Sequence, residues 1–200
     1  MSRGDTISSL DQPSQDPEAP DSTTGGFVRR AILETLGTIV PAILIALFVN
    51  VFVAQAMVIQ GPSMQPNLYY DERVLIDKIT YHFLHGPRRG DIVVVNVPGE
   101  EIPLIKRVVA LPGEAIEVRN GQVLINDRPL EEPWPIQAGG PSYGPELVPP
   151  LHVFVLGDNR ANSRDSRILG PIAIDQIIGK ARLIYWPPEE SAVLRSQIGD

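Results

Sequence analysis

Hydrophobic and polar residues divide the chain into three regions. Residues 1–26 are polar, contain no aromatic residue and carry five acidic residues. Residues 36–59 read LGTIVPAILIALFVNVFVAQAMVI and contain no charged residue. Beyond residue 60, the apolar positions fall in short runs bounded by Gly, Pro and Asn. This pattern predicts a disordered acidic tail over residues 1–30, a transmembrane helix over residues 31–58 and a β-rich domain over residues 59–200.

The apolar region is long enough to cross a bilayer as a helix, which needs about 20 residues. A cleavable signal peptide is the alternative, because Ala54-Gln55-Ala56 is a small-x-small pattern at the end of the run. The length of the run and the acidic leader favour an uncleaved anchor. Arg29 and Arg30 precede the run, and the next basic residue is Arg73. The positive-inside rule therefore predicts a cytoplasmic amino terminus and an extracytoplasmic β domain.

Short strands dominate the predicted structure of the third region. The apolar runs expected to form them are residues 73–76, 91–97, 103–110, 115–119, 122–126, 151–156 and 177–185. Asn120-Gly121 lies between two alternating runs and predicts a tight hairpin. The proline-rich stretch Pro129–Pro150 predicts a loop or linker insertion rather than a core strand. Residues 77–85 are expected to form a short helical turn, and Arg89-Gly90-Asp91 is expected to be a turn that leads into a strand.

Composition narrows the classes of function. About 140 residues beyond position 60 suffice for one hydrophobic core. The net charge of −7 argues against nucleic acid as a partner. The chain has no cysteine, which excludes disulfides, thiolate metal sites and a cysteine nucleophile. Lysine is scarce, with three residues among seventeen basic ones.

Three stretches combine residue types that carry chemistry. Gly61 and Pro62 predict a turn that holds the Ser63 hydroxyl on a shaped loop, and a turn without a catalytic role is the alternative. On the strand 103–110, Lys106 and Arg107 point to opposite faces, so one of them has apolar neighbours. Burial lowers the pKa of a lysine but leaves an arginine charged, which makes Lys106 a candidate base. An edge strand whose lysine reaches water is the alternative. Residues 156–170 form a loop so rich in Asp, Asn, Arg and Ser that we expect an internal hydrogen-bonded network.

Other catalytic constellations fit the sequence less well. A triad of Ser63, His152 and Asp158 is a minor alternative to a Ser/Lys pair. His82 and His85 lack carboxylate or thiol partners at a ligand spacing, so no metal site is predicted.

In this order and behind one amino-terminal span, four stretches resemble the boxes of type I signal peptidases, over about residues 36–185. The stretch 59–68 is similar to the nucleophile box, 89–94 to the R-G-D-I-V-V box, 105–114 to the general-base box, and 157–170 to the G-D-N-R-x-N-S-x-D-S-R-x-x-G box. The resemblance implies a mainly β fold: a signal-peptidase-like catalytic domain behind one transmembrane helix, with residues 112–150 as a small, variable β insertion.

The resemblance also implies roles for individual residues. Ser63 would be the nucleophile and Lys106 the general base of a serine endopeptidase that removes signal peptides after small-x-small sites. Ser163 would orient Lys106 through a hydrogen bond, and Asp165 and Arg167 would form a supporting ion pair. The implied walls of the substrate pockets are Met57, Ile59, Met64, Leu68, Leu104 and Ile105.

Two positions depart from the pattern of the family. Gly61 stands where many members have a serine that supplies a side-chain oxyanion donor, and Asn67 stands where threonine is usual. A backbone N–H group or a water would then have to replace the missing hydroxyl.

The expected partners are the signal peptides of pre-proteins exported by the Sec or Tat routes, and the lipid bilayer. No cofactor, metal or nucleic acid is expected, and the chain is expected to be a monomer in a cell membrane. Ala54-Gln55-Ala56 is a candidate self-cleavage site. One rival hypothesis is a non-catalytic, membrane-anchored β domain that binds exported proteins, which would leave Lys106 unexplained. Another is a Ser/Lys self-cleaving repressor, which the acidic and then hydrophobic amino terminus disfavours.

Overall fold

The computed structural model describes residues 23–196 of the 200-residue chain. The chain forms two compact units that divide after Leu44. Most of the predicted acidic tail lies outside the described residues. Its predicted end at residue 30 is wrong, because the first helix begins at Thr23.

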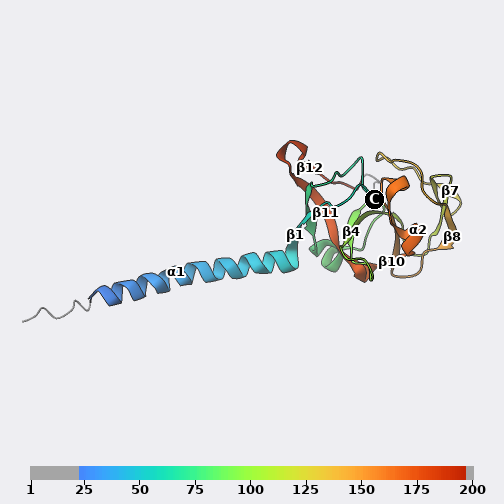
Figure 1. The fold of residues 1–200 in the computed structure, drawn as a ribbon. Helices are drawn as coiled ribbons and strands as arrows, with labels where there is room; N and C mark the ends of the chain where they lie inside the picture. Colours follow the sequence, from blue (N-terminus) through green and yellow to red (C-terminus); the bar gives the residue numbers. More distant parts are fainter. Residues whose placement is uncertain (1–22, 197–200) are drawn as a thin grey trace, which may run out of the picture. The chain divides into compact units, whose positions relative to one another are not determined.

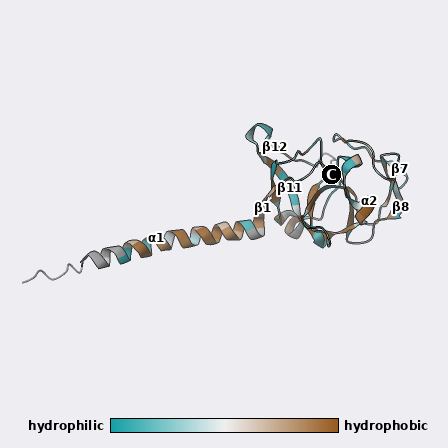
Figure 2. Ribbon diagram, viewed as in Figure 1, coloured by the Kyte–Doolittle hydropathy of each residue, from teal (hydrophilic) through white to brown (hydrophobic). Residues whose placement is uncertain are grey.

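Helix α1 (Thr23–Phe48) contains the apolar stretch Arg29–Phe48, which has a mean hydropathy of 2.2 and is not buried by any other part of the described chain. Hydrophobic residues occupy most of this ribbon (Figure 2). The π-helix η1 (Val49–Val53) follows. By length and composition, α1 is a candidate membrane span.

The helix does not continue to residue 58, as the sequence predicted. Residues Ala54–Val58 form strand β1 instead, which pairs antiparallel with strand β2 (Arg73–Asp77). Apolar content alone does not distinguish the end of a helix from an apolar strand, and the available partner strand decides the outcome.

The larger sheet has eight strands in the order β1-β2-β11-β3-β4-β9-β10, with β12 paired to β11, and every pairing is antiparallel. Figure 1 labels β1, β4, β10, β11 and β12 of this sheet. Its remaining strands are β3 (Ile92–Val95), β4 (Leu104–Ala110), β9 (His152–Leu156), β10 (Ile172–Ala173), β11 (Ile177–Trp186) and β12 (Ala192–Val193). The strands predicted at 73–76, 91–97, 103–110, 151–156 and 177–185 are confirmed.

A second sheet has four strands in the order β7-β6-β5-β8. Strands β5 (Ala115–Arg119) and β6 (Gln122–Ile125) form the predicted hairpin, with Asn120 and Gly121 both at positive φ. Strand β7 (Arg128–Pro129) extends it. Strand β8 (Tyr143–Leu147) was not predicted; it lies at the edge of the sheet, where its proline is tolerated.

Short helices complete the second unit. They are the π-helix η2 (Thr80–Leu84), the 3-10 helices η3 (Arg160–Asn162), η4 (Ile174–Gln176) and η5 (Pro188–Glu190), and the α-helix α2 (Ser166–Leu169). The helical turn predicted within residues 77–85 is η2, and Arg89-Gly90 is the turn that leads into β3.

Candidate active site

Ser63 lies on the loop between β1 and β2, which residues of the hydrophobic core hold in place. The Ile59, Met64 and Leu68 side chains of this loop are at most 1% exposed and pack against the core strands. The carbonyl of Ser63 accepts a hydrogen bond from the backbone N–H of Asn159 at 3.0 Å, which ties the loop to the polar segment after β9. The Ser63 side chain is therefore held at the surface of a rigid support.

Lys106 lies on β4, between β3 and β9. Only 3% of it is exposed. Its ammonium nitrogen Nζ donates to Ser63 Oγ at 2.9 Å and to the backbone carbonyl of Ile105 at 2.8 Å. The structure thus brings together the two residues that the sequence predicted as nucleophile and base.

Burial lowers the pKa of Lys106 from 10.5 to about 8. The negative charges of Asp165, Glu100 and Asp158 oppose this effect, because they favour the protonated form. A lysine with a pKa near 8 is partly neutral at physiological pH and can accept a proton.

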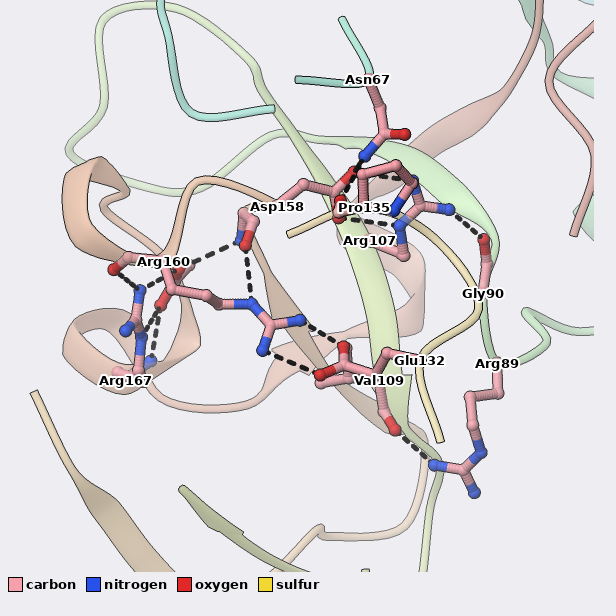
Figure 3. A network of polar contacts seen from close by, with 12 residues as sticks. Asn67, Arg89, Gly90, Arg107, Val109, Glu132, Pro135, Asp158, Arg160 and Arg167 are labelled. Atoms are coloured by element: carbon pink, nitrogen blue, oxygen red, sulfur yellow. Dashed lines mark hydrogen bonds and ion pairs between the residues drawn. The ribbon is translucent and has the colours of Figure 1, made fainter. Parts of the chain in front are cut away.

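Within the described residues, the polar loop after β9 takes part in three buried ion pairs: Arg167–Asp165, Arg107–Asp158 and Arg160–Glu132. Arg167 contacts Asp165 at 2.8 Å, so the predicted pair is present, and the Asp165 carboxylate also accepts the backbone N–H groups of Gly157 and Arg167. Arg107, on the face of β4 opposite Lys106, forms a bidentate pair with Asp158 at 2.6 and 2.8 Å (Figure 3). The Arg107–Asp158 pair ties the loop to strand β4 of the large sheet, and the Arg167–Asp165 pair lies within the loop.

Ser163 does not bond Lys106 as the resemblance implied. Its Oγ is buried and has no hydrogen-bond partner among the described residues. Ser163 Oγ lies against the backbone of Gly157. A Cβ added to Gly157 would come within 2.3 Å of Ser163 Oγ and 2.5 Å of the Ser63 carbonyl oxygen. The Ser163 hydroxyl is therefore close to the loop that carries Ser63. Lys106 donates two of its three N–H groups, to Ser63 and to Ile105.

An apolar cavity of about 300 Å³ opens beside Ser63 and Lys106. Four of the six predicted wall residues, Met57, Ile59, Leu104 and Ile105, line it. The prediction is wrong for Met64 and Leu68, which are 0% exposed because they face the core beneath the serine loop. The sequence prediction missed the neighbours of the predicted walls, which are Gln55, Val58, Gln60, Ile102 and Pro103. It also missed Ile76, Val94 and Ile178, which come from β-strands distant in sequence.

Gly61 also lines this cavity, and a Cβ built on it would meet no atom within 4 Å. The backbone there has φ of +155°, which side chains rarely adopt. The position has room for a hydroxyl but a conformation that favours glycine.

The triad of Ser63, His152 and Asp158 is not assembled. The Asp158 carboxylate is bound by Arg107 and Asn67, and His152 Nδ1 lies 2.9 Å from the carbonyl of Pro150. Within residues 23–196, no group of His, Asp and Glu side chains is arranged to hold a metal ion.

A serine hydroxyl bonded to a buried lysine of lowered pKa, beside an apolar cavity in a β domain, is an arrangement typical of serine hydrolases. The model of the family "Signal peptidase, peptidase S26" matches residues 32–186. Signal peptidase I of Leptolyngbya laminosa is 39% identical over 181 residues, covering 86% of this chain and 89% of that protein. A probable signal peptidase I-2 of Synechocystis is 38% identical over 162 residues, covering 78% and 73%.

Among solved structures, a signal peptidase I from Enterococcus faecalis V583 matches with a TM-score of 0.41 and 28% identity, covering 47% of this chain and 95% of that one. The chain belongs to the type I signal peptidases, a family of serine endopeptidases.

Proposed function

We propose that the protein removes signal peptides from exported pre-proteins, with Ser63 as nucleophile and Lys106 as general base. The observation that carries this proposal is the 2.9 Å hydrogen bond between Lys106 Nζ and Ser63 Oγ, made by a lysine whose pKa burial lowers to about 8. An arginine in this place would keep its proton and could not act as a base.

The reaction proceeds through an acyl-enzyme. Neutral Lys106 accepts the Ser63 proton as Oγ attacks the scissile carbonyl. The protonated lysine then gives that proton to the departing amine, and a water deprotonated by Lys106 hydrolyses the ester. Because Gly61 has no hydroxyl, we assign the oxyanion to the backbone N–H of Ser63 and to a water or a further backbone donor.

The cavity supports a preference for small apolar residues before the cut. Its walls are mostly aliphatic, its volume is about 300 Å³, and Ser63 and Lys106 are among the residues that line it. Two shallow subsites within it would accept alanine-sized side chains at the first and third positions before the scissile bond. Larger side chains would clash with walls from β1 and β4.

Helix α1 would anchor the protein in the membrane. Its apolar stretch of 20 residues, Arg29–Phe48, suits a single span, and the basic residues at its start favour a cytoplasmic amino terminus. Anchoring would raise the effective concentration of the site toward signal peptides that lie in the same bilayer.

Processing of a tagged pre-protein by the full-length chain in detergent micelles or proteoliposomes tests the proposal. Ser63→Ala and Lys106→Met should abolish processing, and Lys106→Arg should do so although it preserves the charge. Arg128→Lys, an exposed change on β7, is the control and should process normally. Wild-type processing by Ser63→Ala would refute the assignment.

The topology has a separate test. Protease added to intact spheroplasts should digest residues 60–200 and spare the amino terminus. Protection of the β domain from the added protease would show that the orientation is inverted.

A further inference from the structure

The segment 132–140, here named the brace segment, belongs to the stretch that the sequence predicted as a loop or linker insertion. In the structure it is fastened along the polar loop after β9. Glu132 forms an ion pair with the buried Arg160 (Figure 3). The carbonyl of Gly139 accepts a hydrogen bond from Arg167 at 3.2 Å. The backbone of Gln137 bonds Asp158 and Arg160 on either side, at 2.9 and 2.8 Å.

The brace segment also reaches the neighbour of the proposed base. The ring of Trp134, 3% exposed, lies 4.5 Å from the guanidinium carbon of Arg107, the residue that follows Lys106 on β4. At Gly140, which has φ of +79°, an added Cβ would come within 2.3 Å of the Arg160 carbonyl. The close approach of the two backbones therefore requires glycine at this point.

Asn67 joins the serine loop to this assembly. Its amide nitrogen Nδ2 donates one hydrogen bond to the carbonyl of Pro135 at 2.7 Å and a second to Asp158 Oδ2 at 2.8 Å (Figure 3). Both N–H donors of the amide are thus used, one on the brace segment and one on the Arg107–Asp158 pair. A hydroxyl such as that of threonine has a single donor and can satisfy only one of the two acceptors.

The serine loop is then held on both sides of the nucleophile. Upstream, the carbonyls of Pro62 and Ser63 accept from the side chain and backbone of Asn159, at 3.3 and 3.0 Å. Downstream, Asn67 provides the tie. The acceptor Asp158 is 0% exposed, so its negative charge strengthens a hydrogen bond that water does not weaken.

We propose that Asn67 is a positioning residue, which ties the serine loop to the Arg107–Asp158 pair and to the brace segment and so holds Ser63 Oγ at Lys106. The proposal rests on the roles proposed above for Ser63 and Lys106. It makes the brace segment a structural part of the active site of this chain.

Steady-state kinetics of the full-length protein in detergent, with a signal-peptide substrate, test the proposal. Asn67→Ala should lower kcat about tenfold and leave KM within about twofold, because the tie acts on geometry rather than on substrate binding. Asn67→Thr retains one donor and should lower kcat about threefold, a partial rescue that a hydrogen-bonding role requires. Asn96→Ala, a change of the same type at an exposed residue after β3, should match the wild type.

Each kcat is calculated per active molecule, and the number of active molecules is measured by saturating the protein with an inhibitor that acylates the serine. A loss of folded protein is then not counted as a loss of rate. The pH midpoint of activity should stay within about 0.3 of the wild-type value, since the groups that set the charge of Lys106 are unchanged. A wild-type kcat in Asn67→Ala overturns the proposal, and so does a shifted midpoint without a fall in kcat.

If Asn67→Ala does not fold, the threonine variant alone decides, and a kcat equal to that of the wild type overturns the proposal. Ser63→Ala is measured in parallel. Its inactivity together with a fully active Asn67→Ala would refute the positioning role and leave the proposed function intact, whereas an active Ser63→Ala would refute the proposed function.

Discussion

The lowered pKa of Lys106 links catalysis and stability, and both can be measured against pH. Lys106→Met removes the titrating group and serves as the reference. Burial lowers the pKa of Lys106 from 10.5 to about 8, which corresponds to about 3 kcal/mol of penalty on the charged form in the native state. The activity of the wild type should rise about tenfold per pH unit below pH 8 and level off above it.

The stability effect has a definite sign. Between pH 8 and 10.5 the unfolded chain binds a proton at Lys106 that the native state has released, so the free energy of unfolding rises with pH over this window. Below pH 8 both states are protonated, and the native state carries the whole penalty. Relative to Lys106→Met, the wild type should therefore gain about 2 kcal/mol of unfolding free energy between pH 7 and pH 9.5.

Two assays on the full-length protein in the same detergent would check these values. The first is kcat/KM on a signal-peptide substrate from pH 5.5 to 10, and the second is denaturant unfolding of the wild type and Lys106→Met at pH 7 and pH 9.5. An activity midpoint near 10.5, or a stability difference independent of pH, would refute the reasoning that burial keeps Lys106 neutral.

Four further substitutions, at three positions, probe the surroundings of the Ser/Lys pair. Ser163→Ala should leave thermal stability unchanged or raise it, because the buried Oγ has no hydrogen-bond partner within residues 23–196. It should still lower kcat about tenfold if that hydroxyl accepts the third N–H of Lys106 during turnover, and an unchanged kcat would exclude this role. Gly61→Ser and Gly61→Ala should each lower the free energy of unfolding by about 1 kcal/mol, because a side chain is strained at the φ of this position. Of the two variants, Gly61→Ser should have the higher kcat if its hydroxyl reaches the oxyanion. Ile178→Ala enlarges the cavity and should raise processing of valine over alanine before the cut about tenfold, as competition between two substrates would show; an unchanged ratio would mean that Ile178 does not limit the cavity.

Local patterns in the sequence predicted most of the β-strands. Alternation and the Asn120-Gly121 turn identify the β5–β6 hairpin, because the conformation of that turn is a property of those two residues. The two-residue strands β7, β10 and β12 were not predicted. Strand β1 and the edge strand β8 were not predicted either. Each forms because a partner strand is available, at β2 and at β5, and such pairings join residues that local patterns do not relate.

In the active site, too, local motifs could be predicted from the sequence and contacts between distant segments could not. Ser63 and Lys106 lie in motifs that can be recognised, and the structure places their side chains 2.9 Å apart. The cavity walls Val94 and Ile178 and the role of the segment 132–140 depend on contacts between distant strands and loops. The resemblance assigned Met64 and Leu68 to the cavity walls, but the turn directs both side chains into the core.

The most direct test of the Ser63–Lys106 pair is the rate at which a serine-directed acylating inhibitor modifies the full-length protein at different pH values, with the site identified by peptide mass spectrometry. We expect a single adduct on Ser63, a rate that rises with pH through a midpoint near 8, and no adduct in Ser63→Ala or Lys106→Met. An adduct on another residue, or labelling of Ser63 at the wild-type rate in Lys106→Met, would contradict the proposed mechanism.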